Sequence, residues 1–398
     1  MSRRRARRHD VSMHSPRVRS AVALATGAAI LLALAACAPA STKHHPGGGS
    51  GHHGAGSTQS ASPTPYVSTL DTTAPTPLAN IGCSNLVTAA DLSVAFPGVS
   101  VSLLPTASMA AGDLAGTDTQ IPAADFVRDA GGIMCIWSNA PADHYITNFP
   151  TIKSEEISFL FNAAGTPWES SQKVDYSDPA SDMNDGSCDT GSCELDQLVN
   201  GKTWVSSLEL NQQPVLNDPF QNITTADTAA ASSVTAQPLP TPAAGTLALG
   251  HTCTAFVADA DASTALGTSV VSSQPLLQQD YMDFYGTWEG AQDELGDHPC
   301  VWTHGSTTVG HLSWLPAGAW AWDEAQALPL ADGTPAPLSV PGLAKGDTAF
   351  IRCSASDASC VTDLIIGGNW IEAQVSQPGS INRAAVTAIA DAIVTKLG

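Results

Sequence analysis

The amino-acid sequence predicts an α+β protein with two tandem homologous domains, each an antiparallel sheet with flanking helices, after a disordered tether. Three observations support this: a basic and then apolar leader that ends at a cysteine, a low-complexity stretch, and motifs that recur 170 residues later. The expected boundaries are residues 1–36 for the leader, 37–79 for the tether, 80–236 for the first domain, 237–246 for a Pro-rich linker and 247–398 for the second domain.

The leader has the composition of a secretory signal. Seven arginines and one acid occupy the first nineteen residues, and an apolar run follows over residues 21–36. This run is shorter than the roughly 20 residues that span a bilayer, which disfavours the alternative of a retained transmembrane helix. Whether translation starts at Met1 or Met13 stays open, and either start leaves the prediction unchanged.

The leader ends in Leu34-Ala35-Ala36-Cys37, which resembles the lipobox of bacterial lipoproteins. In that motif the cysteine sulfur receives diacylglycerol and the residue becomes the new N-terminus. Two acyl chains anchor a protein stably, whereas one chain binds only marginally. The resemblance implies a protein lipid-anchored to the cell membrane through Cys37, on its extracytoplasmic face.

The tether is rich in Gly, Ser, Thr, Pro and His and has almost no large apolar side chain. Such a segment cannot bury enough surface to offset its ordering entropy, so we expect disorder. Two histidine pairs, His44-His45 and His52-His53, could bind Zn, Cu or Ni weakly. No cysteine or carboxylate stands near them, so we expect a solvated linker and no metal site or other cofactor.

Removal of the leader makes the chain strongly acidic. The cut removes seven of the 16 basic residues and one of the 37 acids, which leaves a net charge of −27. This charge repels nucleic acid and anionic headgroups, so neither is an expected partner.

Four blocks of residues occur twice in the same order and with similar spacing. They are Cys83-Ser-Asn-Leu86-Val87 and Cys253-Thr-Ala-Phe256-Val257; Cys135-Ile-Trp137 and Cys300-Val-Trp302; Ile157-Ser-Phe-Leu160 with Trp168 and Leu312-Ser-Trp-Leu315 with Trp320; and Cys188, Cys193, Asp196 and Trp204 with Cys353, Cys360, Asp363 and Trp370. The blocks indicate a tandem duplication of a unit of about 150 residues, an ordinary domain size.

The cysteine count agrees with this interpretation, because nine cysteines are Cys37 plus four in each repeat. Outside the cytoplasm an even set at matched positions indicates disulfides, and four cysteines allow three pairings. We favour the long-range bridge in each repeat because it constrains the unfolded chain most, together with a short local bridge. The favoured pairs are Cys83–Cys135, Cys188–Cys193, Cys253–Cys300 and Cys353–Cys360. Zinc binding is the rival interpretation, but no Cys-x-x-Cys pair is present.

Periodicity and turn signals predict the elements of each repeat. Apolar residues at 86, 87, 92, 95 and 96 predict a helix that Gly98 ends, and Asn200-Gly201 and Gly367-Gly368 predict hairpins. The remaining predicted elements are strands at residues 99–104, 135–138, 157–161, 361–366 and 370–375, a short helix at 168–174, and helices at 223–234 and 382–397.

The opening cysteine and Leu/Val-rich helix, followed by Cys-x-Trp, resemble a family of actinobacterial envelope lipoproteins of unknown function. They are also similar to extracytoplasmic sensor domains of actinobacterial serine/threonine kinases. The resemblance covers both repeats and implies an α/β sandwich-like domain in the cell envelope. It supplies no catalytic residues. Two features depart from the usual pattern: the two copies, and an insertion of about ten residues after Cys135.

No catalytic constellation is evident, so we expect a binding or sensing protein and not an enzyme. His298 and His304 flank Cys300 but have no matched partner in the first repeat, which makes a hydrolase the last alternative. Acids around Cys188 and Cys193 could hold Ca²⁺ on a loop, although their spacing fits no calcium motif. An accessory subunit of an envelope protein complex is the second alternative.

Aromatic residues give the candidate binding surface for an unknown envelope ligand or protein. The matched tryptophans are most simply core residues, whereas the unmatched Trp288, Trp314 and Trp322 are better candidates for an exposed surface. The stretch 280–288 has no evident counterpart in the first repeat, so the shared fold does not need it. We therefore place the candidate site at Tyr281, Phe284, Tyr285 and Trp288.

Overall fold

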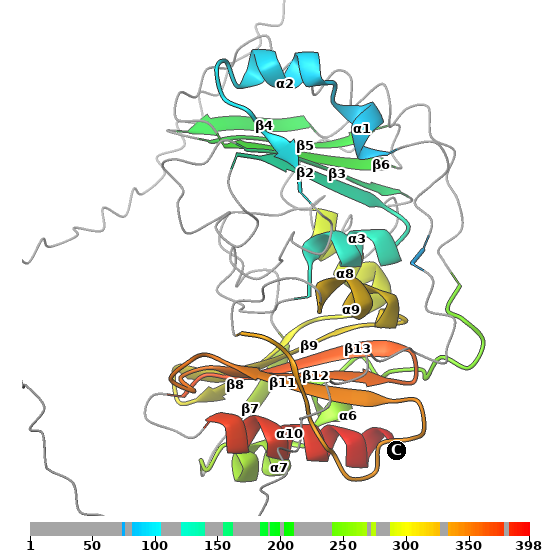
Figure 1. Ribbon diagram of the computed structural model, residues 1–398, viewed down its shortest axis with the longest axis vertical. Coiled ribbons are helices and arrows are strands. Elements are labelled where there is room, and N and C mark those ends of the chain that lie inside the picture. The colour runs from blue at the N-terminus through cyan, green and yellow to red at the C-terminus, as the bar shows by residue number, and fades with distance from the viewer. Residues whose placement is uncertain are drawn as a thin grey trace, which may run out of the picture. The chain divides into compact units, whose positions relative to one another are not determined.

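The computed structural model describes two antiparallel sheets with helices on their faces (Figure 1). The described residues are 74–75, 82–104, 121–139, 154–161, 184–189, 192–199, 203–210, 241–268, 272–275, 287–326, 333–377 and 382–398. The predicted leader, the 168–174 and 223–234 helices and the insertion after Cys135 lie outside these ranges, and so does the predicted tether apart from Ala74 and Pro75. The predicted α+β class is confirmed. Among the helices described, none is long and apolar enough to cross a membrane.

The first sheet has six strands in the order β1-β2-β3-β6-β5-β4. In chain order its elements are α1 (Cys83–Leu86), α2 (Ala89–Ala95), β1 (Ser102–Leu103), α3 (Ala123–Asp129), β2 (Ile133–Ser138), β3 (Ser154–Phe161), β4 (Asn184–Asp189), β5 (Ser192–Val199) and β6 (Thr203–Leu210). The predicted opening helix is thus two helices, because the chain is extended at Val87 and Thr88. The five apolar residues that predicted it are all buried.

The second sheet has seven strands in the order β10-β11-β12-β13-β9-β8-β7. Its elements are α6 (Cys253–Phe256), α7 (Asp259–Ala265), β7 (Ser272–Pro275), α8 (Thr287–Leu295), β8 (Cys300–His304), β9 (Thr307–Leu315), α9 (Ala319–Ala325), β10 (Ala336–Pro337), β11 (Thr348–Cys353), β12 (Cys360–Ile366), β13 (Asn369–Val375) and α10 (Asn382–Leu397). Both predicted hairpins are present as β5–β6 and β12–β13, and the predicted 382–397 helix has the observed bounds.

The strand register agrees between the two sheets. Leu160 on β3 pairs with Trp204 on β6, and Leu315 on β9 pairs with Trp370 on β13. The strand order also matches when β1, β2, β3, β6, β5 and β4 are compared with β7, β8, β9, β13, β12 and β11. The recurring blocks that lie on described strands therefore occupy corresponding strands and the same pairing positions.

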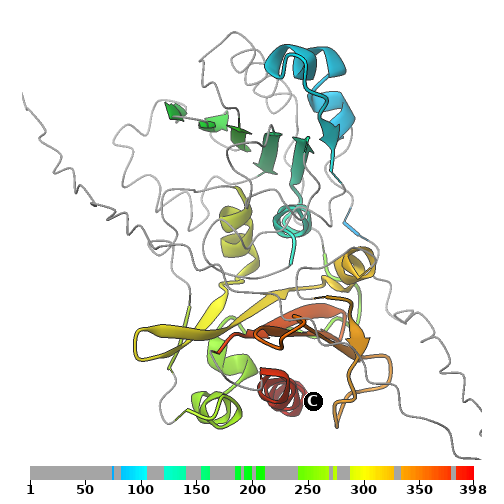
Figure 2. The ribbon, with the colours of Figure 1, turned by 60° about the vertical axis from the view of Figure 1, so that its left-hand side comes forward.

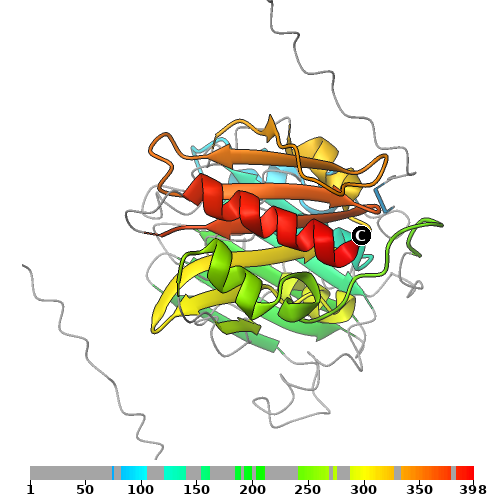
Figure 3. The same cartoon turned by 90° about the horizontal axis from the view of Figure 1, so that it is seen from below.

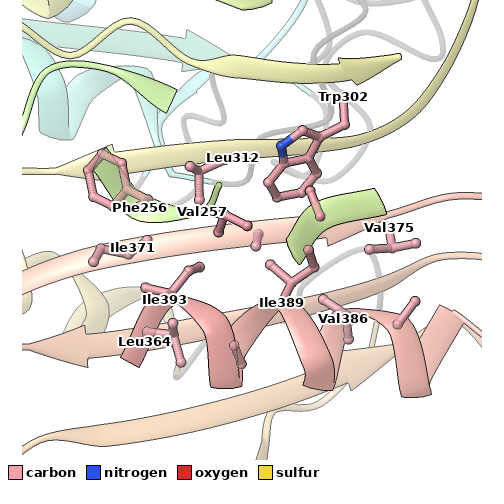
Figure 4. Packing of buried hydrophobic residues seen from close by; sticks show 14 of the residues in the cluster. Phe256, Val257, Trp302, Leu312, Leu364, Ile371, Val375, Val386, Ile389 and Ile393 are labelled. Atoms are coloured by element: carbon pink, nitrogen blue, oxygen red, sulfur yellow. The ribbon is translucent and has the colours of Figure 1, made fainter. Parts of the chain in front are cut away.

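The outer face of each sheet packs against its opening helices. On the first sheet, Cys135, Phe159 and Val205 meet Leu92 and Phe96. On the second sheet the core is larger because α10 joins α6 and α7. Figure 4 shows Ile389 and Ile393 of α10 pointing at this sheet, beside residues such as Leu312, Leu364 and Ile371.

A shared helical layer lies between the two sheets (Figure 2). It consists of α3, α8 and α9, and its core joins Phe126 and Trp204 to Trp322 and Trp370. Helix α8 follows the second sheet's first strand in the chain, yet it packs on β3 and β6 of the first sheet. The Thr287 hydroxyl donates to the Ser158 hydroxyl oxygen at 2.6 Å across this contact. Helices α3 and α8 were not predicted from the sequence.

Three disulfides are present among the described residues, with the favoured pairing. Cys83–Cys135 and Cys253–Cys300 each tie an opening helix to the second strand of its sheet, and Cys353–Cys360 links β11 to β12. Cys188 and Cys193 are opposite each other in the β4–β5 register, as Cys353 and Cys360 are in β11–β12. The side chains of that fourth pair lie outside the description, so its bond stays a prediction.

Candidate functional site

A groove of about 670 Å³ runs between α7 and α10 on the outer face of the second sheet. Figure 3 shows these two helices side by side across that face. Phe256, Leu266 and Ala385 belong to the apolar lining, and Ala265, Ala388 and Ala392 line it further. Because alanines occupy so many facing positions, the two helices leave space above the sheet that larger side chains would fill.

The polar groups of the groove are few. Asp261, Asp391 and Lys396 contribute the charged side chains of the lining. One oxygen of Asp391, Oδ1, is buried and has no hydrogen-bond partner among the described residues. An apolar groove of this volume with a few polar groups is typical of small-molecule binding sites, which range over about 300–1,000 Å³. Such an arrangement is suited to holding an apolar ligand and orienting its polar end.

The predicted aromatic site is described only in part. Tyr281, Phe284 and Tyr285 lie outside the described residues, and Trp288 is placed by its backbone alone, in the first turn of α8. The structure therefore does not show whether these four side chains come together. The end of the 280–288 stretch does have a counterpart in the first sheet, because α8 takes the same place in the element order as α3.

The expectation that Trp314 and Trp322 are exposed is wrong. Both side chains are fully buried: Trp314 packs on Phe256 with ring centroids 4.4 Å apart, and Trp322 packs on Phe350 and Trp370. Trp314 has a counterpart after all, since Phe159 holds the matching position on β3. The matched tryptophans Trp137, Trp302, Trp204, Trp370 and Trp320 are buried, as predicted.

The described histidines of the second sheet lie on different elements: His304 ends β8, His311 is on β9, and His251 and His298 are in loops. His311 on β9 is buried, and burial lowers its pKa to about 4, so its ring is neutral at pH 7. Ser313 lies two residues further along the same strand, but neither its Oγ nor His311 Nδ1 has a hydrogen-bond partner. Nucleophilic catalysis commonly joins the nucleophile and its base through a hydrogen bond, and these two side chains do not make one in this structure. His251 Nδ1 lies 2.8 Å from the Gly296 carbonyl oxygen, which is a contact between loops.

The candidate metal ligands are explained by other bonds or lie outside the description. Cys353, Asp357 and Cys360 are close together, but the two sulfurs are bonded to each other and are not free thiolates. Asp357 lies 3.5 Å from the Arg383 guanidinium. The acids near Cys188 that suggested a calcium loop lie partly on β4 and β5, so the expected loop is a strand hairpin there.

Two buried polar clusters were missed by sequence reasoning. Arg352 on β11 donates to both oxygens of Asp363 and to Glu372 Oε2, at 2.8–3.1 Å, and all three side chains are at most 2% exposed. The Trp370 indole N–H also donates to Asp363. The available signal was an acid inside each of the two predicted strands, Asp363 and Glu372, with Arg352 as the basic residue that precedes them.

The second missed cluster consists of carboxyl groups on and next to α3 and α8. Asp125 and Asp297 are 0% exposed, and Asp129 is 7% exposed. Burial raises the pKa of Asp125 and of Glu294 to about 8, and that of Asp129 to about 7. The signal in the sequence was an acid followed two residues later by a glycine, which occurs at Asp129 with Gly131 and at Glu294 with Gly296.

Comparison of the chain with protein-family models, curated proteins and solved structures gave no match. The function is therefore inferred from the residues and the geometry of this chain.

Proposed function

We propose that this chain is a lipid-anchored binding protein of the cell envelope, exposed on the extracytoplasmic side of the membrane through diacylglycerol on Cys37. Its folded part derives from two tandem copies of one domain. That domain is similar, in its cysteine and tryptophan motif, to a family of actinobacterial envelope lipoproteins of unknown function. The proposed activity is non-enzymatic binding or sensing of an envelope ligand.

The observation that carries the proposal is the matched pair of helix–strand disulfides, Cys83–Cys135 and Cys253–Cys300. Cytosolic thiols are kept reduced, so structural disulfides favour an oxidising compartment outside the cytoplasm. The favoured pairs use every cysteine except Cys37, which directly follows the apolar leader. A leader that ends at an unpaired cysteine, followed by a disulfide-bonded fold, supports export with lipid attachment.

The ligand class follows from the groove between α7 and α10. Its volume and alanine-rich lining suit a small, mainly apolar molecule, with Asp261 and Lys396 available for a polar end. The aromatic residues Tyr281, Phe284, Tyr285 and Trp288 are the other proposed binding region. The two regions make different predictions when each is altered separately.

The anchor is tested by metabolic labelling with an alkyne fatty acid. We expect the wild-type chain to carry the label at the mass of the cleaved form, and the Cys37→Ser variant to carry none. A Cys353→Ser, Cys360→Ser double variant is the matched control, and it should keep its label because those sulfurs are bonded to each other. A Cys37→Ser protein that still carries the lipid label would refute the anchor.

Binding is tested by purifying the protein from its native envelope and analysing co-purifying lipids and proteins by mass spectrometry. We expect a small apolar ligand that is lost in the Ala388→Trp variant, because the indole fills the groove. The ligand should be kept in the control variant Thr387→Trp, because the neighbouring residue Thr387 is outside the groove lining. Loss in a Tyr281→Ala, Phe284→Ala variant instead would place the site in the aromatic stretch. Recovery of one stoichiometric protein would favour an accessory subunit, and recovery of neither class would reject binding.

A further inference from the structure

Helices α3 and α8 pack against each other, and each carries an acid in its last turn. Asp129 is the final residue of α3, and Glu294 is the penultimate residue of α8. A glycine with positive φ follows each acid by two residues, Gly131 at +80° and Gly296 at +70°. The two acids therefore hold matching positions in the two halves of the chain. A carboxylate at a helix C-terminus is disfavoured by the helix dipole.

Two further carboxyl groups extend this pair into a cluster. Asp125 lies one turn before Asp129 on α3, and Asp297 lies two residues after α8. Both are 0% exposed. Neither oxygen of Asp125 has a hydrogen-bond partner among the described residues, and the donor near Asp297 is the Trp314 backbone N–H. Glu294 is only half-buried, but its Oε2 is also buried without a partner. A buried carboxylate with no partner is strongly disfavoured relative to the protonated acid.

His251 Nδ1 lies 2.8 Å from the Gly296 carbonyl oxygen, between Glu294 and Asp297, and His298 directly follows Asp297. The permanent cation near Asp125, within the described residues, is Arg128 on α3. Its charge lowers the pKa of Asp125 in part. The same guanidinium lies over the Trp320 ring at 5.0 Å, and its Nε donates to the Pro75 carbonyl oxygen at 2.9 Å. Arg128 is thus held at α9 and the chain near Pro75.

The elements packed around α3 and α8 bring acids and neutral groups. Glu324 on α9 raises the pKa of Asp125, and Asp323 precedes it. On β9 the titratable side chain is His311, whose ring is neutral at pH 7. The other acids of neighbouring elements are Glu289 and Asp293 on α8, Glu155 and Glu156 on β3, and Glu209 on β6. Arg352 is engaged with Asp363 and Glu372 on the second sheet.

We propose that Asp125, Asp129, Glu294 and Asp297 form a proton-dependent contact that holds α3 against α8 while the carboxyl groups are protonated and releases it when they ionise. In the protonated state the contact between the two halves is uncharged. On ionisation each carboxyl gives its proton to water and leaves like charges in a buried interface, which repel one another. This regulation goes beyond the proposed binding function and depends on neither Cys37 nor a ligand.

The direction of the pH effect follows from the raised pKa values. Burial raises the pKa of Asp129 to about 7 and the pKa values of Asp125 and Glu294 to about 8. It also raises the pKa of Asp297 well above its usual range. The charge of Asp129 raises the pKa of Asp297 further, and the nearby Trp314 backbone N–H lowers it in part. In the separated state these groups titrate near pH 4. The stabilisation is therefore complete below about pH 4 and is lost as the pH rises through about 7–8.

The test is hydrogen–deuterium exchange of the purified full chain at about pH 5.5 and about pH 8.5, corrected for the intrinsic exchange rate. We expect the protection factors of the α3 and α8 amides to fall roughly tenfold or more at the higher pH. A factor of ten is the change in opening equilibrium that a pKa difference of one unit produces. The α10 amides should keep theirs. Unchanged protection of α3 and α8, or an equal loss throughout the chain, would overturn the proposal.

Substitution locates the effect in the four side chains. An Asp125→Asn, Asp129→Asn, Glu294→Gln, Asp297→Asn variant mimics the uncharged state, so its α3 and α8 protection should not depend on pH. Asp357→Asn, at a half-exposed acid between β11 and β12, is the matched control and should behave as the wild type. A quadruple variant that keeps the wild-type pH dependence would overturn the proposal.

A second measurement needs no substitution and so remains available if the variant does not fold. Infrared titration of the wild-type protein should show a protonated-carboxyl band at about pH 6 that disappears by about pH 9. Ordinary carboxyl groups are ionised at both values, since they titrate near pH 4. Absence of that band at about pH 6 would overturn the proposal.

Discussion

The two sheets have the same strand order, but the side chains described on the faces that meet the shared layer of α3, α8 and α9 differ. The first sheet contributes apolar residues to this layer, among them Met134, Ile136 and Leu160. The second sheet adds the ion cluster of Arg352 and its two acids. In the register, Asp196 faces Ser206 on the first sheet, whereas Asp363 faces Glu372 on the second.

The comparison shows which positions define the common frame. Cysteines, tryptophans and the Leu–Trp pairs occur at the same places in both sheets because they fix helix to strand and strand to strand. The buried polar positions differ between the two sheets. A buried polar group needs hydrogen-bond partners, and each sheet can supply them with its own set of residues. The second sheet therefore depends on a set of mutual hydrogen bonds in its interior, and removal of Arg352 leaves two acids buried without their cation.

The largest expected effect is that of Arg352→Met. The change leaves Asp363 and Glu372 buried without their cation, and loss of one partner from a buried ion pair costs about 3–5 kcal/mol of unfolding free energy. Urea denaturation followed by tryptophan fluorescence measures this loss. Conversion of all three residues to apolar ones of similar size should recover most of it, because no unpaired charge then remains.

Arg383→Met is the matched control for this prediction. Arg383 and Asp357 are about half exposed, at 51% and 44%, and lie 3.5 Å apart, so their interaction is screened by water. Its loss should change stability by less than about 1 kcal/mol. If both arginine variants lost the same small amount, the buried cluster would not distinguish the second sheet from the first.

A smaller effect separates the sheets in acid. His311 on β9 matches the position of Glu156 on β3, and burial lowers its pKa from 6.5 to about 4. Its contribution to stability is present above pH 6.5 and is lost as the pH falls towards 4, because the unfolded chain then binds the proton first. Between pH 7 and pH 5 we expect a loss of about 2 kcal/mol from this group.

The His311→Leu variant isolates that loss. Its stability difference from the wild type, measured by urea denaturation at pH 5 and pH 7, cancels the carboxyl groups that the two proteins share. The wild type should lose about 2 kcal/mol more than the variant over this interval. An equal loss in both would show that His311 can take up a proton without disturbing the fold.

Elements with a strong local pattern could be predicted from the sequence. The α10 helix follows from apolar residues at Ala385, Val386, Ile389 and Ile393, all buried against the sheet. The β12–β13 hairpin follows from Gly367-Gly368, both of which have positive φ. These signals lie within a few residues of each other, so no tertiary information was needed.

Helices α3 and α8 could not be found in the same way. The sequence of α3 places acids at Asp125 and Asp129 among its buried residues, which breaks the expected apolar face. Helix α8 is covered by the other sheet, and nothing in its own sequence indicates that partner. The groove was missed for a related reason, because its two walls, α7 and α10, are more than a hundred residues apart in the chain.

The smallest expected effect concerns the second helix of each half. Helix α2 begins with a capping box, in which the Thr88 hydroxyl accepts from the Asp91 N–H and the Asp91 carboxylate accepts from the Thr88 N–H. Helix α7 has Asp261 at the same position but Ala258 at its N-cap, without a side-chain hydrogen bond. Helix α7 therefore has the acid of the capping box but not the hydroxyl.

Exchange of these two cap residues should move stability in opposite directions. Thr88→Ala should cost about 1 kcal/mol, and Ala258→Thr should add up to about 1 kcal/mol because its hydroxyl would accept from the Asp261 N–H. Urea denaturation measures both, and an Ala258→Thr, Asp261→Ala variant tests whether the gain needs the acid. A loss of stability in Ala258→Thr would show that α7 begins in a geometry different from that of α2, although both helices carry an acid three residues after the cap.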